Sequence, residues 1–317
     1  MLYLIFTDSR IDGEAVLAMM AQYRTSLALR DKDPQTVFSD EIDRTIYNED
    51  PHFKPLELDD LSKVNIDTAL AFIRKALNPA DYTFIFIGNL NLYIMREYVE
   101  SYLAAIPRGG SWNTWTDLNI KRPGKVEKTV YKGKEEQSSV YLAWFSKAPY
   151  SDKLSVISEV LNEYLDIKLN DEIREKLGGV YSIDSDVSVS PVPQGELSMN
   201  VRFNCDPKRA RELQASVIAV LNQTASNVID RDTFTKAVKA SKEVWEYSHS
   251  NYSIAKRYAN SSVLLSLPLS RLDSWAWSKL YDAVTPADIQ RVCGQLIQSD
   301  TNGPVVVVLM PENARGL

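Results

Sequence analysis

Histidine and cysteine, the side chains that most often hold zinc in proteins, are scarce in this sequence. Its 317 residues contain two histidines, His52 and His249, and two cysteines, Cys205 and Cys293. Neither histidine lies three or four positions from the other, and the cysteines are far apart, so H-E-x-x-H, H-x-x-E-H and C-x-x-C are all absent. The sequence therefore predicts a chain with no catalytic or structural metal site of its own.

Long apolar runs and blocks of one charge are missing as well. The longest apolar runs, residues 82–87 and 304–310, have strand length, whereas a membrane-spanning helix needs about 20 apolar residues. Residues 1–7 lack the basic start and the apolar length of a secretory signal. The net charge of −6 is spread along the chain without a basic segment. We expect no membrane span and no nucleic-acid partner.

The usual nucleophilic and acid–base patterns are also absent. No G-x-S-x-G motif occurs, and the side chains of Ser248–Ser250 diverge because neighbours in a helix do not face each other. The carboxylate pairs Asp59–Asp60 and Glu135–Glu136 are typical of helix starts and turns. A catalytic centre contained within this chain is not predicted.

The most informative residues present are Arg174–Ile183. An apolar pattern with helical spacing precedes them and ends near Leu177; it comprises Leu154, Ile157, Val160, Leu161, Tyr164, Leu165, Leu169 and Ile173. Gly178 and Gly179 can adopt the left-handed backbone that closes a helix, and an extended segment then follows. We expect Arg174 and Tyr181 to share one surface, where both can donate to one peptide carbonyl oxygen.

This arrangement resembles the Arg/Tyr pair of the pitrilysin/insulinase-type zinc peptidases, the inverzincins, including the separation of the two residues. The resemblance covers most of the chain and includes Phe84–Gly88, followed by a helix that ends at Ile106–Pro107. It implies that the chain is the C-terminal half of a four-domain member. In that family an H-x-x-E-H helix in the N-terminal half holds the zinc, and the Arg/Tyr pair reaches the site from the other half.

The resemblance implies peptide hydrolysis inside a closed chamber. Arg174 and Tyr181 would position the substrate carbonyl or its tetrahedral adduct, and Gly178 and Gly179 would support the turn between them. The implied partners are the N-terminal half of the same polypeptide and a peptide substrate. Zinc is expected in that missing half and no cofactor in this chain, which alone should be inactive. A periplasmic or cell-envelope location is favoured over a cytoplasmic one.

A second reading is a non-catalytic, pitrilysin-like scaffold or binding subunit that never held a metal. Such a protein would keep the fold without the chemistry. The presence of both Arg174 and Tyr181 favours the active parent, because a scaffold need not keep two polar groups at one site.

The predicted fold class is α+β, with two related units that each combine a mainly antiparallel sheet with helices on one face. The resemblance implies the LuxS/mitochondrial-processing-peptidase-like metallohydrolase fold. Residues 1–107 would be the C-terminal part of a third domain, 108–127 a connector and 128–317 a complete fourth domain. The first unit has fewer predicted strands, so we expect it to be truncated.

Local patterns predict the individual elements. In the first unit we expect strands at Leu2–Thr7 and Tyr82–Ile87, and helices from Asp12, after Asp33–Pro34, and over residues 67–77 and 90–105. In the second unit we expect strands at 128–132, 138–145, 181–190, 196–205 and 305–309, and helices after Ser151–Asp152, from Pro207, from Asp232, around Ser274 and from Thr285–Pro286.

Overall fold

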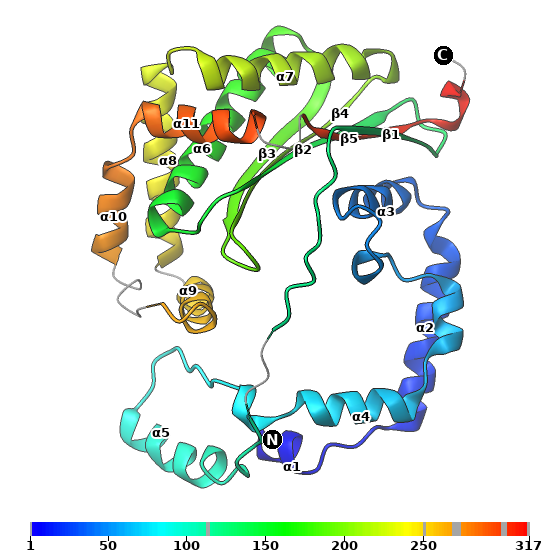
Figure 1. Cartoon of the computed structure of the whole chain (residues 1–317), viewed down its shortest axis with the longest axis vertical. Coiled ribbons are helices and arrows are strands. Elements are labelled where there is room, and N and C mark those ends of the chain that lie inside the picture. The colour runs from blue at the N-terminus through cyan, green and yellow to red at the C-terminus, as the bar shows by residue number, and fades with distance from the viewer. Residues whose placement is uncertain (1, 112–114, 250–251, 268–273, 299–302, 316–317) are drawn as a thin grey trace. The chain divides into compact units, whose positions relative to one another are not determined.

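The computed structural model of the chain describes residues 2–111, 115–249, 252–267, 274–298 and 303–315. The chain divides into two compact units, each assembled from several segments (Figure 1). Unit 1 comprises residues 1–30, 56–118 and 251–272, and unit 2 comprises residues 31–55, 119–250 and 273–317.

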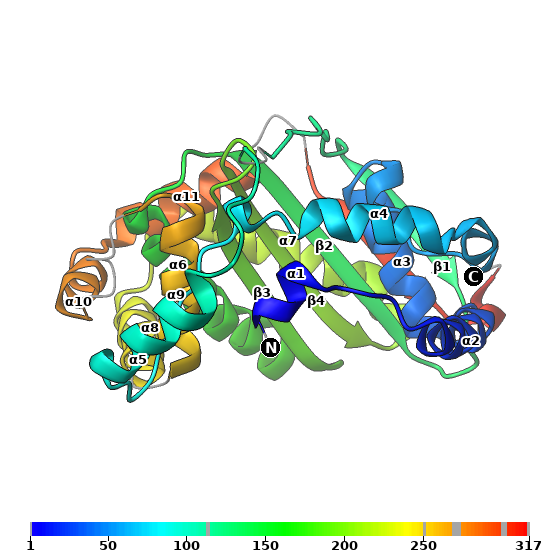
Figure 2. The same ribbon diagram turned by 90° about the horizontal axis from the view of Figure 1, so that it is seen from below.

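Unit 2 is built on a five-stranded sheet with the order β1-β5-β2-β4-β3, and Figure 2 labels β1, β2, β4 and β3 of this sheet. The strands are β1 (Val126–Tyr131), β2 (Ser138–Lys147), β3 (Val180–Ser190), β4 (Glu196–Cys205) and β5 (Val305–Met310). β1 and β5 pair in parallel, and the other neighbours pair antiparallel. The five strands predicted for the second unit and the α+β class are confirmed.

Three helices cover one face of this sheet: α6 (Asp152–Leu169), α7 (Ala210–Ser226) and α11 (Pro286–Ile297) (Figure 1). Beneath them, opposed residues of β2 and β4 such as Leu142 and Val201 are fully buried. Two further helices, α8 (Arg231–His249) and α10 (Ser274–Asp282), pack against α6. The predicted helices of this unit are thereby confirmed.

The opposite face of the sheet is partly covered by α3 (Pro34–Ile46). Asp33 caps this helix by accepting from the Thr36 amide, and Pro34 occupies its first turn as predicted. Its buried side chains Phe38 and Ile42 pack on a second apolar cluster made of Tyr141, Ala143, Phe145, Val305, Val307 and Leu309. The prediction of helices mainly on one face therefore needs this addition, and α3 belongs to the compact unit that contains the sheet.

Arg122 anchors the segment that leads into β1. Its guanidinium lies 4.7 Å from the centroid of the Tyr47 ring and 4.2 Å from that of Phe145. It donates to both Glu196 carboxylate oxygens, at 3.0 and 2.7 Å, and to the Ile46 carbonyl at 3.1 Å. One side chain thus joins the end of α3, the start of the sheet and β4.

Unit 1 is helical among the residues that the structure describes. Its α-helices are α1 (Leu2–Thr7), α2 (Gly13–Arg30), α4 (Ile66–Ala76), α5 (Leu92–Tyr98) and α9 (Tyr252–Leu264), and a π-helical turn, Val99–Leu103, extends α5. The predicted helices at the positions of α2, α4 and α5 are confirmed.

The strands predicted at Leu2–Thr7 and Tyr82–Ile87 are wrong. Leu2–Thr7 is a helix, and Tyr82–Ile87 has no regular secondary structure. A strand needs a neighbour that pairs with its backbone groups, and no described segment of unit 1 pairs with either one. The two segments still touch, because the Phe6 ring lies 4.9 Å from that of Tyr82 and 6.0 Å from that of Phe84, between centroids. The first predicted sheet is therefore absent from the described residues.

Candidate functional site

The helix that carries Arg174 ends where the sequence predicts. Ser151 caps the start of α6 by accepting from the Leu154 amide at 3.1 Å. After Leu169 the helix continues as a π-helical turn, Asn170–Lys176, and Leu177 still has helical dihedral angles. Arg174 lies within this wider turn, a feature that often occurs at functional sites.

Two glycines close the helix with left-handed backbone. Gly178 has φ +61° and Gly179 has φ +92°, so the predicted turn is confirmed. A Cβ at Gly178 would meet no atom within 4 Å, whereas a Cβ at Gly179 would lie 2.1 Å from Nη1 of Arg209. Gly178 is therefore required by its backbone conformation alone, and Gly179 by conformation and by space.

Tyr181 lies on an irregularity of the edge strand β3. Val180 is opposite Cys205, but Ile183 is opposite Phe203, so β3 advances three residues while β4 advances two. The extra residue makes a β-bulge at Tyr181 and Ser182, and both are exposed between the buried Val180 and Ile183. Bulges redirect side chains and are common beside active sites.

Arg174 and Tyr181 are both accessible from solvent. The Arg174 side chain is 52% exposed and its Nε is 3.9 Å from Oε1 of Glu175, and Tyr181 is 75% exposed. An ion pair at this distance between exposed groups constrains the guanidinium little. Both donors are thus available, and their convergence on one carbonyl oxygen stays a prediction.

The strand that carries Tyr181 is tied to the helix that carries Arg174. Asp166 of α6 accepts from the Ser185 amide at 2.8 Å and from the Ser185 hydroxyl at 2.7 Å. Burial raises the pKa of the Asp166 carboxyl, while these two hydrogen bonds oppose the rise. The contact fixes β3 against α6 four residues beyond Tyr181.

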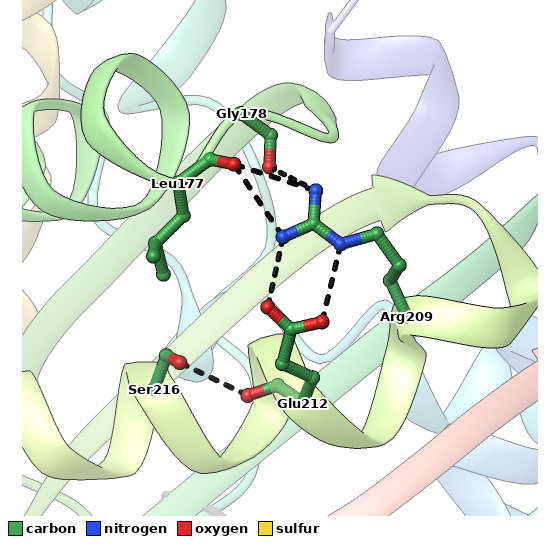
Figure 3. A network of polar contacts seen from close by, with 5 residues as sticks. All are labelled: Leu177, Gly178, Arg209, Glu212 and Ser216. Atoms are coloured by element: carbon green, nitrogen blue, oxygen red, sulfur yellow. Dashed lines mark hydrogen bonds and ion pairs between the residues drawn. The ribbon is translucent and has the colours of Figure 1, made fainter.

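Arg209, at the start of α7, was not predicted as part of this site. Figure 3 shows its guanidinium between the helix end and Glu212. Nη1 donates to the Gly178 carbonyl at 2.7 Å, and Nη1 and Nη2 both reach the Leu177 carbonyl at 3.4 Å. Nε and Nη2 donate to the Glu212 carboxylate at 3.2 and 2.9 Å.

One signal in the sequence marks Arg209 as an unusual helix-start residue, although it does not identify the glycine turn as its partner. The residue lies two positions after Asp206–Pro207, a typical helix start, and a positive charge there opposes the helix dipole. An arginine at such a position needs acceptors nearby. Glu212, three residues later, is one of them, and the glycine turn supplies the others.

The described residues do not form a zinc site. His52 Nδ1 lies 2.9 Å from Asp50, and Cys205 and Cys293 are buried free thiols whose pKa burial raises to about 12. In the part of the chain that the structure describes, no group of three or more His, Cys, Asp or Glu side chains could hold a metal. The His249 side chain lies outside the described residues. No described helix has the length and apolar composition needed to cross a membrane.

Comparisons with known proteins agree on one family. The family described as "Peptidase M16 inactive domain" matches residues 63–241, more than half of the chain. The chain is 26% identical to "Probable zinc protease PqqL" from Haemophilus influenzae over 167 residues, which are 52% of this chain and 18% of that protein. It is 24% identical to "Zinc protease PQQL-like" from Arabidopsis thaliana over 232 residues, 67% of this chain and 24% of that protein.

The fold is also similar to a solved structure. The crystal structure of the periplasmic protease PqqL from Escherichia coli matches with a TM-score of 0.79 and 21% identity, over 96% of this chain and 34% of that chain. The chain thus spans about a quarter or less of the two curated relatives and about a third of this structure. The expected resemblance to pitrilysin/insulinase-type zinc peptidases is confirmed: the chain belongs to the peptidase M16 inactive-domain family.

Proposed function

We propose that this chain positions the substrate in a zinc-dependent peptidase whose N-terminal half carries the metal. The observation that carries the proposal is the placement of Arg174 and Tyr181, both exposed, on either side of the glycine turn. The relatives are zinc proteases by name, which supports the reaction class. The chain itself is expected to be inactive.

In this proposal the two side chains bind one peptide carbonyl. The Arg174 guanidinium supplies a charged donor and the Tyr181 phenol a neutral one. Their hydrogen bonds would strengthen as negative charge develops on the carbonyl oxygen during hydrolysis. Water activation by zinc belongs to the other half of the protein.

Unit 1 supports the proposal that another part of the protein packs on this chain. Its helices α4 and α5 carry large exposed apolar side chains, among them Phe72, Leu92 and Tyr93. Large areas of exposed apolar surface often mark sites that a partner covers. The proposed partner is the N-terminal half of the same polypeptide.

The test uses the protein that contains both halves and a flexible peptide as substrate. We expect Tyr181→Phe and Arg174→Ala each to lower kcat/KM by roughly ten- to a thousand-fold, because a transition-state donor is lost. The double variant should lose less than the product of the two factors, because the pair acts as a unit. Tyr247→Phe and Arg211→Ala, at exposed positions on α8 and α7, serve as matched controls.

Unaltered hydrolysis in both single variants would refute the role of the pair. The alternative function, a non-catalytic scaffold or binding subunit, is favoured by the description of the family as an inactive domain. It predicts that the protein with both halves cleaves no peptide and binds no stoichiometric zinc.

A further inference from the structure

We propose that Arg209 is a positioning residue for Arg174 and Tyr181, because it fixes the glycine turn that joins them. This inference rests on the proposed function of the pair. It adds a residue that touches neither the substrate nor the pair directly and acts through the backbone of residues 177–179.

The first argument is the use of the guanidinium donors. The last carbonyls of a helix have no partner within the helix, and here the carbonyl of the C-cap residue Leu177 and that of the next residue, Gly178, accept from Arg209. The positive charge also lies at the negative end of the helix dipole. Arg209, 31 positions after Gly178, therefore supplies the hydrogen-bond donors that this helix end lacks.

The second argument is that Arg209 itself is held from two sides. Its guanidinium makes a two-point contact with the Glu212 carboxylate, whose oxygens lie 2.9 and 3.2 Å away. Its amide donates to the Asp206 carbonyl at 2.9 Å, and Asp206 directly follows the buried Cys205 of β4. Both contacts lie within the β4–α7 junction, so residues of this junction hold the Arg209 guanidinium in place.

The third argument is that the turn is held at both of its ends. Cys205 is opposite Val180 in the sheet, so the residue directly before Tyr181 is paired with the strand that leads to Arg209. At the other end, Arg209 binds the carbonyls directly after the helix of Arg174. The segment between the two functional side chains is thus held at one end by the pairing of Val180 with Cys205 and at the other end by Arg209.

The absence of a side chain at Gly179 gives an independent sign of this contact. The guanidinium occupies the space that a Cβ would take, at 2.1 Å from Nη1 and 3.0 Å from Cζ. A Cβ at Gly178 would meet no atom within 4 Å, so space does not require a glycine at that residue. The close approach of Arg209 thus depends on a glycine at residue 179.

The test compares Arg209→Gln with Arg211→Gln, which removes an exposed charge from the same helix. Hydrogen exchange by mass spectrometry should show roughly ten-fold faster exchange of the amides of 177–181 in Arg209→Gln only, because these backbone groups lose their anchor. In the protein with both halves, kcat/KM should fall roughly ten- to a hundred-fold, mainly in kcat, since a small misplacement of a donor is costly.

A double-mutant cycle separates positioning from general stability. If Arg209 acts through the pair, Tyr181→Phe should cost less in the Arg209→Gln background than in the wild type. Arg209→Lys should retain only part of the activity, because one ammonium cannot serve two carbonyls and a carboxylate as the planar guanidinium does. A merely structural role would leave the cost of Tyr181→Phe unchanged.

Two outcomes overturn the inference, and they differ from failure of the proposed function. Unchanged exchange of 177–181 in Arg209→Gln would show that the cap does not order the turn. Additive costs of Arg209→Gln and Tyr181→Phe would show that the turn does not serve the pair, even though Tyr181 matters. If Tyr181→Phe and Arg174→Ala are themselves silent, the proposed function fails and this inference with it.

Discussion

Both units contain helices with many apolar residues, but they bury these side chains to very different degrees. α6 in unit 2 buries Val156, Ile157, Ser158, Val160, Leu161, Tyr164, Leu165 and Leu169, whereas α2, α4 and α5 in unit 1 bury no residue. The difference arises because α6 packs on a sheet and unit 1 has no described strand. An apolar stripe therefore specifies a helix, and only a matching surface turns it into a core.

The largest expected effect is a loss of stability in unit 2. Two side-chain truncations, one in each unit, test it. Leu161→Ala on α6 should lower the free energy of unfolding by about 2–5 kcal/mol, since Leu161 is fully buried and leaves a cavity. Phe72→Ala on α4, where the ring is 70% exposed, should change it by about 0.5 kcal/mol or less. Urea denaturation followed by circular dichroism measures both. Equal losses would contradict the contrast between the units.

A smaller loss of stability is expected when the contact made by Arg122 is removed. This contact joins the segment that leads into β1 with the rest of unit 2. Arg122→Ala should cost about 2 kcal/mol, because it removes hydrogen bonds to a carboxylate and a packed cation over two rings. The neighbouring exposed Lys121→Ala is the control and should be nearly neutral. If both variants unfold at the same urea concentration as the wild type, Arg122 does not anchor the segment.

The smallest expected effect is within the glycine turn. Gly178→Ala should cost about 1 kcal/mol, because a Cβ is strained at φ +61° but meets no neighbour. Gly179→Ala should cost more, since its Cβ must also displace the Arg209 guanidinium. Thermal unfolding of the two variants provides the comparison, and the reverse order would argue against the Arg209 contact.

The features of unit 2 that follow from local patterns could be predicted from the sequence. Alternation at β3 and β4, the apolar run at β5 and the periodicity before Leu177 each report the environment of consecutive residues. The glycine turn is predictable for the same reason, since left-handed backbone is a property of single residues.

Features that depend on distant partners could not be predicted. Tyr82–Ile87 has the composition of a strand, but pairing requires a neighbour that local sequence does not specify. Arg209 reaches Gly178 across 31 positions of the chain, and no periodicity reports such a contact. The placement of α3 on the sheet depends in the same way on surfaces formed by residues much later in the chain.

The strand order has a consequence for the timing of folding. β5 is the last strand to be synthesised, yet it lies between β1 and β2 and pairs with both. Until Val305–Met310 leave the ribosome, β1 has no strand beside it and the inner edge of β2 is open. Contacts between residues so far apart in sequence form slowly. A nascent chain would therefore hold a three-stranded precursor of β2, β4 and β3, and the sheet would be completed from its middle once β5 has been made.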